Sequence, residues 1–177
     1  IFLRLRSILG RRTGHEENLD RNVSSEFSSK KIDENQLEKV EFDEKEKSDF
    51  LKGAKIAYET IITNFAKDNL KNIKHLLDHN IFNQFNESIK DKKNKGYVSE
   101  TTFIGIKSAL IKEFEKKANV IEITVDFVSE IISTVKDKEN KILSGDPEKI
   151  KKVYDTWKFS KDIKSNNPNW LLIDTQI

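Results

Sequence analysis

The chain has 177 residues, of which 36% are hydrophobic and 35% are charged, and its formal net charge is +2 at pH 7. This length suits one domain with a tail, and the near-neutral charge gives no argument for direct nucleic-acid binding. Cysteine is absent, which excludes disulfides, thiolate metal sites and cysteine nucleophiles.

The first segment, residues 1–21, holds all the arginines of the chain. Up to position 12 it carries no acidic residue, and apolar residues are interleaved with the basic ones. This composition suits a membrane interface, in which basic side chains attract anionic head groups. The apolar residues 1–3 could be the end of a membrane span or a few ordinary residues, and from these three residues alone the second is favoured. A solvated basic tail or a nucleic-acid arm is the open alternative. The residues predicted to contact anionic lipid are Arg4, Arg6, Arg11 and Arg12.

Residues 22–47 form a polar and mostly acidic stretch. Between Asn22 and Asp49 there are nine acidic residues and five lysines, with only scattered apolar residues. Such a stretch buries too little apolar surface to offset the entropy of an ordered chain. We therefore predict a flexible linker, followed by a folded domain over residues 48–177.

Three helices are predicted at the start of this domain. Over residues 48–67 apolar residues recur three and four positions apart, which indicates an amphipathic helix that Ser48 or Asp49 could cap. A short helix is expected over residues 70–77. A third, over residues 80–92, carries Ile81, Phe85 and Ile89 on one stripe.

Strand-like runs replace the helical spacing after Gly96. Residues 101–117 are predicted to pair with residues 120–135 around a turn at residues 116–119. In the first run Ile104 and Ile106 are expected to share a face, and Gly105 suggests a bulge. In the second run the apolar alternation slips after Val128, which predicts a bulge there.

The last stretch, residues 148–174, is predicted to be a hairpin with a polar turn at residues 165–169. In its first strand Asp155 shares a face with Val153, Trp157 and Phe159, because side chains alternate with period two. Three helices followed by four strands indicate an α+β domain, with a curved antiparallel sheet covered by helices. Such a domain encloses an apolar cavity. The residues expected in the cavity or the core are Phe50, Tyr58, Ile61, Phe65, Phe127, Trp157, Phe159 and Trp170.

Motifs for chemistry are weak. His75 and His79 lie four apart, which would place both on one helix face, but a solvated pair is favoured over a zinc site. The six glycines form no nucleotide-binding loop, so no nucleotide cofactor is predicted. With the histidine pair interpreted as solvated, no metal is predicted either. An acid or base in an apolar cavity is the remaining catalytic option, and its candidates are Asp126, Tyr58 and Tyr154. A solvent-facing Asp126 is the favoured interpretation.

Several motifs occur in the order seen in one family. Residues 42–43, 50–54 and 57–59 resemble the first helix of the C-terminal domain of the mitochondrial inner-membrane import translocase subunit 44 and its alphaproteobacterial relatives. Residues 145–147, 155–159 and 167–170 resemble the closing hairpin of that domain. Residues 4–14 are similar to the juxtamembrane segment of the bacterial members, which follows a single N-terminal span. Lys161 departs from the pattern, since arginine is expected there.

The resemblance implies a nuclear transport factor 2-like cone with a large apolar pocket, and a membrane-anchored adaptor instead of an enzyme. The mitochondrial relatives bind cardiolipin-rich membrane and tether a heat-shock chaperone beside the channel. The implied partners are therefore anionic lipid and a protein, which is a translocase, a chaperone or an unfolded client. Because basic residues flanking a span stay in the cytoplasm, the domain is expected on the cytoplasmic face of the inner membrane. The mitochondrial matrix face is the alternative.

Two other functions stay open at this point. A cone of this kind could be a pocket enzyme of isomerase type, which would need an ionisable group inside the cavity. It could also be a membrane receptor for ribosomes, like related mitochondrial proteins.

Overall fold

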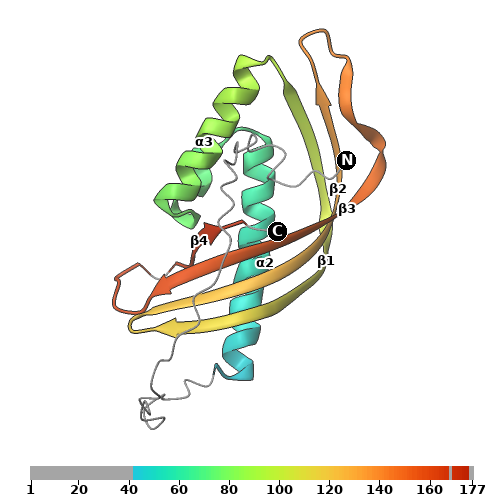
Figure 1. The fold of residues 1–177 in the computed structure, drawn as a ribbon. Helices are drawn as coiled ribbons and strands as arrows, with labels where there is room; N and C mark the ends of the chain where they lie inside the picture. The colour runs from blue at the N-terminus through green and yellow to red at the C-terminus, as the bar shows by residue number, and fades with distance from the viewer. Residues whose placement is uncertain (1–41, 168, 176–177) are drawn as a thin grey trace, which may run out of the picture.

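The computed structural model describes residues 42–167 and 169–175, in which three helices precede four strands (Figure 1). The helices are α2 (Glu44–Ala66), the 3₁₀ helix η1 (Leu70–Leu76) and α3 (His79–Asn94). The strands are β1 (Val98–Lys117), β2 (Val120–Lys136), β3 (Ile142–Asp162) and β4 (Leu171–Asp174). The predicted α+β class, with helices packed on a four-stranded antiparallel sheet, is confirmed.

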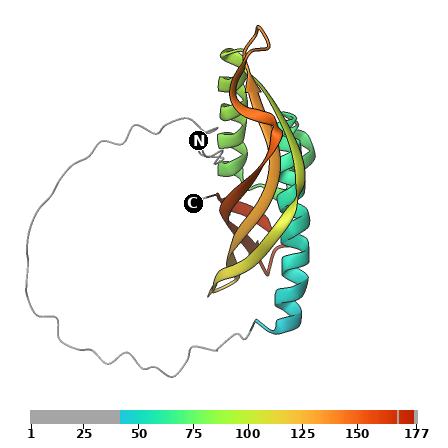
Figure 2. The same cartoon turned by 90° about the vertical axis from the view of Figure 1, so that its right-hand side faces the viewer.

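The sheet has the order β1-β2-β3-β4, so every strand pairs with its neighbour in sequence. The predicted hairpin between β1 and β2 is present: Lys117 pairs with Val120, and Ala118 in the turn has a φ of 53°. The second hairpin is also present, since Phe159 of β3 pairs with Leu172 of β4. Figure 2 shows the long strands twisting and bending together beside α2.

The bulge predicted at Gly105 is confirmed, because the pairing of β1 with β2 shifts between Phe103 and Gly105. This shift also makes one prediction wrong. Ile104 is 46% exposed whereas Ile106 packs against the core, so the two do not share a face. A bulge adds one residue to a strand, and the simple period-two alternation fails across it.

The bulge predicted in β2 after Val128 is wrong. Phe127, Ser129, Ile131 and Ser133 are all buried, so the alternation continues without a slip. The irregularity in the pairing of these two strands lies on β1, where the register shifts between Ile106 and Ser108, opposite Ser129 and Val128. The apolar pattern was misleading because two of the inward positions carry serine.

Helix α2 begins at Glu44, four residues before the predicted start, and this corrects the expected capping. Asp43 is the N-cap: its carboxylate accepts the backbone N–H of Glu46 at 2.7 Å, and the Glu46 carboxylate accepts the Asp43 N–H at 3.1 Å. Two otherwise unpaired donors are satisfied by this capping box. The stacking of Phe42 on Phe114, with ring centroids 4.8 Å apart, also ties the start of α2 to β1.

The two shorter helices lie where the sequence predicted them. Residues 70–76 form a 3₁₀ helix, and α3 starts at His79 because the Asp78 carboxylate accepts the backbone N–H of Ile81 at 2.7 Å. His75 and His79 therefore belong to different helices, so the expectation that they share one helix face is wrong.

The core is an aromatic cluster between α2 and the sheet. The ring of Tyr58 stacks on Phe127 with centroids 4.3 Å apart and lies 4.6 Å from Trp157. Phe65 packs on Phe85 of α3 at 4.7 Å, so the same helix also holds α3. Aromatic rings contribute large buried areas, and α2 is therefore the element around which the sheet and the other helices assemble.

Strand β3 bends sharply near its start. Ile131 pairs with Lys151 and Ser133 with Asp146, so residues 147–150 have no partner in β2. Gly145 lies beside this bend with a φ of +88°, and an added Cβ would lie 2.0 Å from the Ser133 carbonyl oxygen. The bend requires glycine at this position.

Gly145→Ala is expected to lower the free energy of unfolding by more than about 2 kcal/mol, because alanine is strained at positive φ and has no room there. The matched control is Gly53→Ala within α2, where no atom lies within 4 Å of the added Cβ. That change should raise the free energy of unfolding by about 0.5–1 kcal/mol through helix propensity. Urea unfolding measures both, and equal effects would contradict this account.

Candidate functional site

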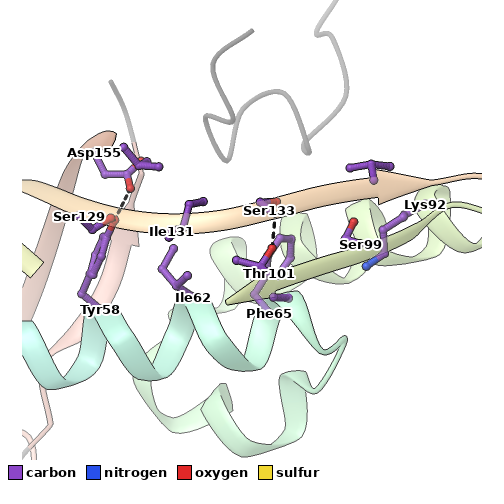
Figure 3. Close-up of a pocket in the computed structure, with 13 residues that line it drawn as sticks. Tyr58, Ile62, Phe65, Lys92, Ser99, Thr101, Ser129, Ile131, Ser133 and Asp155 are labelled. Atoms are coloured by element: carbon purple, nitrogen blue, oxygen red, sulfur yellow. Dashed lines mark hydrogen bonds between the residues drawn. The ribbon is translucent and has the colours of Figure 1, made fainter. Parts of the chain in front are cut away.

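A cavity of about 60 Å³ lies between α2 and the concave side of the sheet (Figure 3). By the volume that one water occupies, it has room for a few water molecules. Helices α2 and α3 and strands β1, β2 and β3 all contribute to its walls. The lining residues are Tyr58, Ile62, Phe65, Ala66, Lys92, Ser99, Thr101, Ser129, Ile131, Ser133, Val135, Val153 and Asp155.

The inner end of the cavity is a chain of hydrogen bonds between three buried side chains. The Tyr58 hydroxyl donates to Asp155 Oδ2 at 2.5 Å, and its oxygen lies 2.9 Å from Ser129 Oγ. Because the Tyr58 proton is directed to Asp155, Ser129 is left to donate to Tyr58. Exposed fractions are 1% for Tyr58, 3% for Asp155 and 0% for Ser129, so water does not compete for these bonds.

Burial shifts the pKa values of the two ionisable side chains at the inner end of the cavity, Asp155 and Tyr58. It raises the pKa of the Asp155 carboxyl above its ordinary value of 3.8, and the hydrogen bond from Tyr58 opposes this in part. Burial, followed by the neighbouring Asp155 charge, raises the pKa of the Tyr58 hydroxyl above its ordinary value of 10.0. Tyr58 thus stays a donor, and Asp155 is biased toward its neutral form.

The rest of the cavity is polar on the side of the sheet and α3 and apolar on the side of α2. In the middle, Thr101 Oγ1 and Ser133 Oγ lie 3.1 Å apart and bridge β1 and β2. At the outer end the Lys92 ammonium forms an ion pair with Asp68, and both side chains are mostly buried. Opposite these groups Ile62 and the other α2 side chains supply an apolar wall (Figure 3).

The residues predicted for the cavity or core separate into three groups. Tyr58 and Phe65 line the cavity. Trp170 is partly buried against the core, and the Lys161 ammonium lies over its ring at 5.9 Å. The remaining predicted residues lie in the buried core away from the cavity: Phe50, Ile61, Phe127, Trp157 and Phe159.

The sequence-based reasoning missed the polar half of the cavity. It placed Asp155 on the same face as Trp157 but did not consider it as a site residue, and it passed over Ser129 and Ser133. A carboxylate between core positions of an alternating strand was the available signal. Of the two other acid–base candidates, Asp126 accepts a hydrogen bond from Thr156 at 2.5 Å and Tyr154 is 57% exposed; neither lines the cavity.

The anionic-lipid contacts predicted for Arg4, Arg6, Arg11 and Arg12 lie outside the described residues. Over residues 42–167 and 169–175, no three His, Asp or Glu side chains gather where they could hold a metal ion. Within the same ranges, no helix combines the length and apolar character needed to cross a membrane.

Comparison with known proteins gives one family. The model of the Tim44-like domain matches residues 28–177, which confirms the resemblance drawn from the motifs. No curated protein matches. Among solved structures, the intermembrane space region of the chloroplast protein ARC6 is similar at 12% identity and a TM-score of 0.43, covering 69% of this chain and 94% of that one.

Asp155→Asn is expected to flatten the pH dependence of stability. Since the folded pKa of Asp155 is raised, the folded protein binds more protons than the unfolded chain at pH values above 3.8. The free energy of unfolding should therefore fall as pH rises from about 4, by at most about 1.4 kcal/mol per pH unit, until the folded pKa is passed. Asparagine can still accept the Tyr58 proton but does not titrate.

Urea unfolding between pH 4 and pH 8 measures the effect as the difference between variant and wild type, which should shift in favour of the variant as pH rises. Asp126→Asn, on the opposite face of the sheet, controls for the loss of one carboxylate. A difference for Asp155→Asn that is constant with pH would contradict the prediction.

Proposed function

The chain belongs to the Tim44-like domain family, and from that premise we propose that it is a non-enzymatic adaptor, tethered to a membrane, in protein translocation or membrane-protein biogenesis. Members of this family are membrane-associated, non-enzymatic components of translocases. The match over residues 28–177 is the observation that carries the proposal. We assign the chain to the alphaproteobacterial, membrane-anchored type because its arginine segment resembles theirs.

Membrane attachment is proposed to depend on residues 1–21. Each basic residue near an anionic surface contributes about 1 kcal/mol, so Arg4, Arg6, Arg11 and Arg12 together would give strong binding to cardiolipin-type lipid. A span before Ile1 would place the domain on the cytoplasmic face of the inner membrane. The matrix face of the mitochondrial inner membrane is the alternative. In either case the linker would be residues 22–41, shorter than the predicted 22–47 because the Asp43 cap and the start of α2 at Glu44 belong to the folded domain.

The domain itself is proposed to be a nuclear transport factor 2-like cone that presents a protein-binding surface. The bent sheet, covered by helices on one side and enclosing a cavity, supports this assignment. The partner is proposed to be a translocase subunit, a chaperone or an unfolded client. A ribosome is the alternative partner, and pelleting with ribosomes at graded salt would separate it from lipid binding.

One observation favours a second candidate function. An isomerase-type enzyme needs an ionisable group in its cavity, and Tyr58 and Asp155 meet this condition. A neutral carboxylic acid beside a tyrosine can stabilise an enolate by hydrogen bonding. Deuterium exchange from D₂O into the α-carbon of 2-pentanone tests this candidate: exchange above background that Asp155→Asn abolishes would favour the enzyme over the adaptor.

Replacing Arg4, Arg6, Arg11 and Arg12 by glutamine should strongly reduce cosedimentation with cardiolipin-containing liposomes. At about 1 kcal/mol for each of the four arginines, the affinity should fall by roughly several hundred-fold, and the wild-type affinity should fall with added salt. The matched control replaces four lysines of α2, Lys45, Lys47, Lys52 and Lys55, and should bind like wild type. Equal binding of wild type and the arginine variant would reject the proposed lipid contact.

A further inference from the structure

A groove lies between the N-terminal half of α2 and one edge of the sheet. Strand β1 is the first strand of the sheet and pairs with β2 alone, so its other edge is open in the described part of the chain. Helix α2 runs beside this edge (Figure 2). The groove has a volume of about 450 Å³, far larger than the cavity inside the domain. Its lining residues are Glu44, Lys47, Ser48, Leu51, Lys52, Lys55, Leu110 and Ile111.

The open edge of β1 offers backbone hydrogen bonds to a partner. Residues 108–111 pair with residues 125–128 of β2 in regular register, and the register shifts on either side of them, after Ile106 and after Ile111. Along an edge strand, alternate residues direct their N–H and C=O groups away from the sheet. Because bulges interrupt such an edge, the regular part of it is short. It therefore suits a short added strand.

The wall formed by α2 has the length and the charge to hold such a strand. Its lining residues recur every one to four positions from Glu44 to Lys55, and their spacing places them on one helix face. At 1.5 Å per residue this face is about 17 Å long, which about five residues of an extended chain span. Three lysines and one glutamate lie on it, so its net charge is positive.

The lysines of the groove are available to an acidic ligand. Lys47 pairs with Glu44 at 2.7 Å and Lys52 with Asp49 at 3.3 Å, and all four side chains are at least 41% exposed. Such exposed pairs contribute little to stability, so a ligand carboxylate can replace the present partner at small cost. Lys55 lies on the same face as these two lysines and adds a third positive charge.

The two faces of the sheet set the side-chain pattern of the ligand. Helix α2 packs on the concave face, so side chains of an added strand that point to this face meet the lysines of α2. Side chains that point the other way lie beside Leu110, which is 65% exposed and pairs with Asp126 on the outer face. Because side chains alternate along a strand, the fitting segment has acidic residues at every second position and apolar residues between them.

We propose that this groove binds a short extended segment of a partner protein, in which acidic and apolar residues alternate and whose backbone pairs with β1. The inference deepens the proposed adaptor function, on which it rests for the existence of a protein partner. A lipid head group has no backbone to pair with β1, so a peptide is favoured. The two proposals can fail separately, because liposome cosedimentation tests residues 1–21 and peptide binding tests the groove.

The test is an NMR titration of the ¹⁵N-labelled full chain at pH 7 with a capped pentapeptide of alternating valine and glutamate. We expect saturable shifts at the amides of residues 44–55 and 108–111. The same peptide with lysine in place of glutamate should bind at least about tenfold more weakly, which corresponds to about 1.4 kcal/mol. Equal binding of the two peptides, or shifts spread over the surface, would overturn the proposal.

Methylation of the peptide nitrogens tests the backbone pairing. Consecutive N–H groups of an extended chain point to opposite edges, so methylating those of the valines blocks one edge and methylating those of the glutamates blocks the other. One of the two methylated peptides should lose binding and the other should keep it. Loss in both, or in neither, would overturn the pairing with β1.

Two double variants of the chain provide the matched control. Lys52→Glu with Lys55→Glu makes the groove acidic, and it should weaken the glutamate peptide at least about tenfold and favour the lysine peptide. Lys45→Glu with Lys71→Glu makes the same change in net charge at exposed positions outside the groove. This control should leave the affinity within about twofold of wild type, because solvent and salt screen distant charges. Equal effects of the two double variants would overturn the proposal.

Two other occupants of the groove give different results. If the acidic residues before α2 filled it, Glu34→Gln, Glu38→Gln and Glu41→Gln together would tighten peptide binding. If a second copy of the chain filled it, sedimentation would show a dimer that Lys52→Glu with Lys55→Glu dissociates. Either result would overturn the assignment of the groove to a partner protein.

Discussion

The position of Tyr58 is the constraint on which the rest of the structure depends. Its ring packs between Phe127 and Trp157, which joins α2 to the two central strands, and its hydroxyl reaches Asp155 and Ser129 on the same strands. One side chain thus provides both an apolar contact across the two layers and a polar connection between them. A buried network of this kind is stabilising only while each member keeps its partner, so it fixes the position of the helix on the sheet.

The cavity follows from this arrangement and from the bends of the sheet. Strand β1 has three register shifts against β2, and β3 leaves residues 147–150 unpaired, so the sheet curves instead of lying flat on α2. The helix closes on the sheet at Tyr58 and packs on α3 through Phe65. Between these two contacts the curved sheet faces the apolar side chains of α2 without touching them, and the cavity remains there.

Membership of the Tim44-like domain family and the chemistry of the cavity bear on different parts of the chain. The family match concerns the domain as a whole and supports a role in membrane-associated translocation. The lipid contact is proposed for an arginine-rich segment that precedes the domain. The cavity has no uncompensated cation among its lining residues, so it is unsuited to the anionic group of such a lipid.

The sequence alone determined the order of three helices and four strands, because helical and strand periodicities reflect local burial that each segment carries by itself. It also determined the inward direction of Asp155, through alternation with Trp157 and Phe159. Only the tertiary structure decided that Tyr58 meets Asp155, since they are 97 residues apart and the packing of Tyr58 on Phe127 and Trp157 brings α2 onto the sheet beside Asp155. The inward serines of β2 were likewise decided only there, because a hydroxyl carries no apolar signal and its burial depends on partners from other elements.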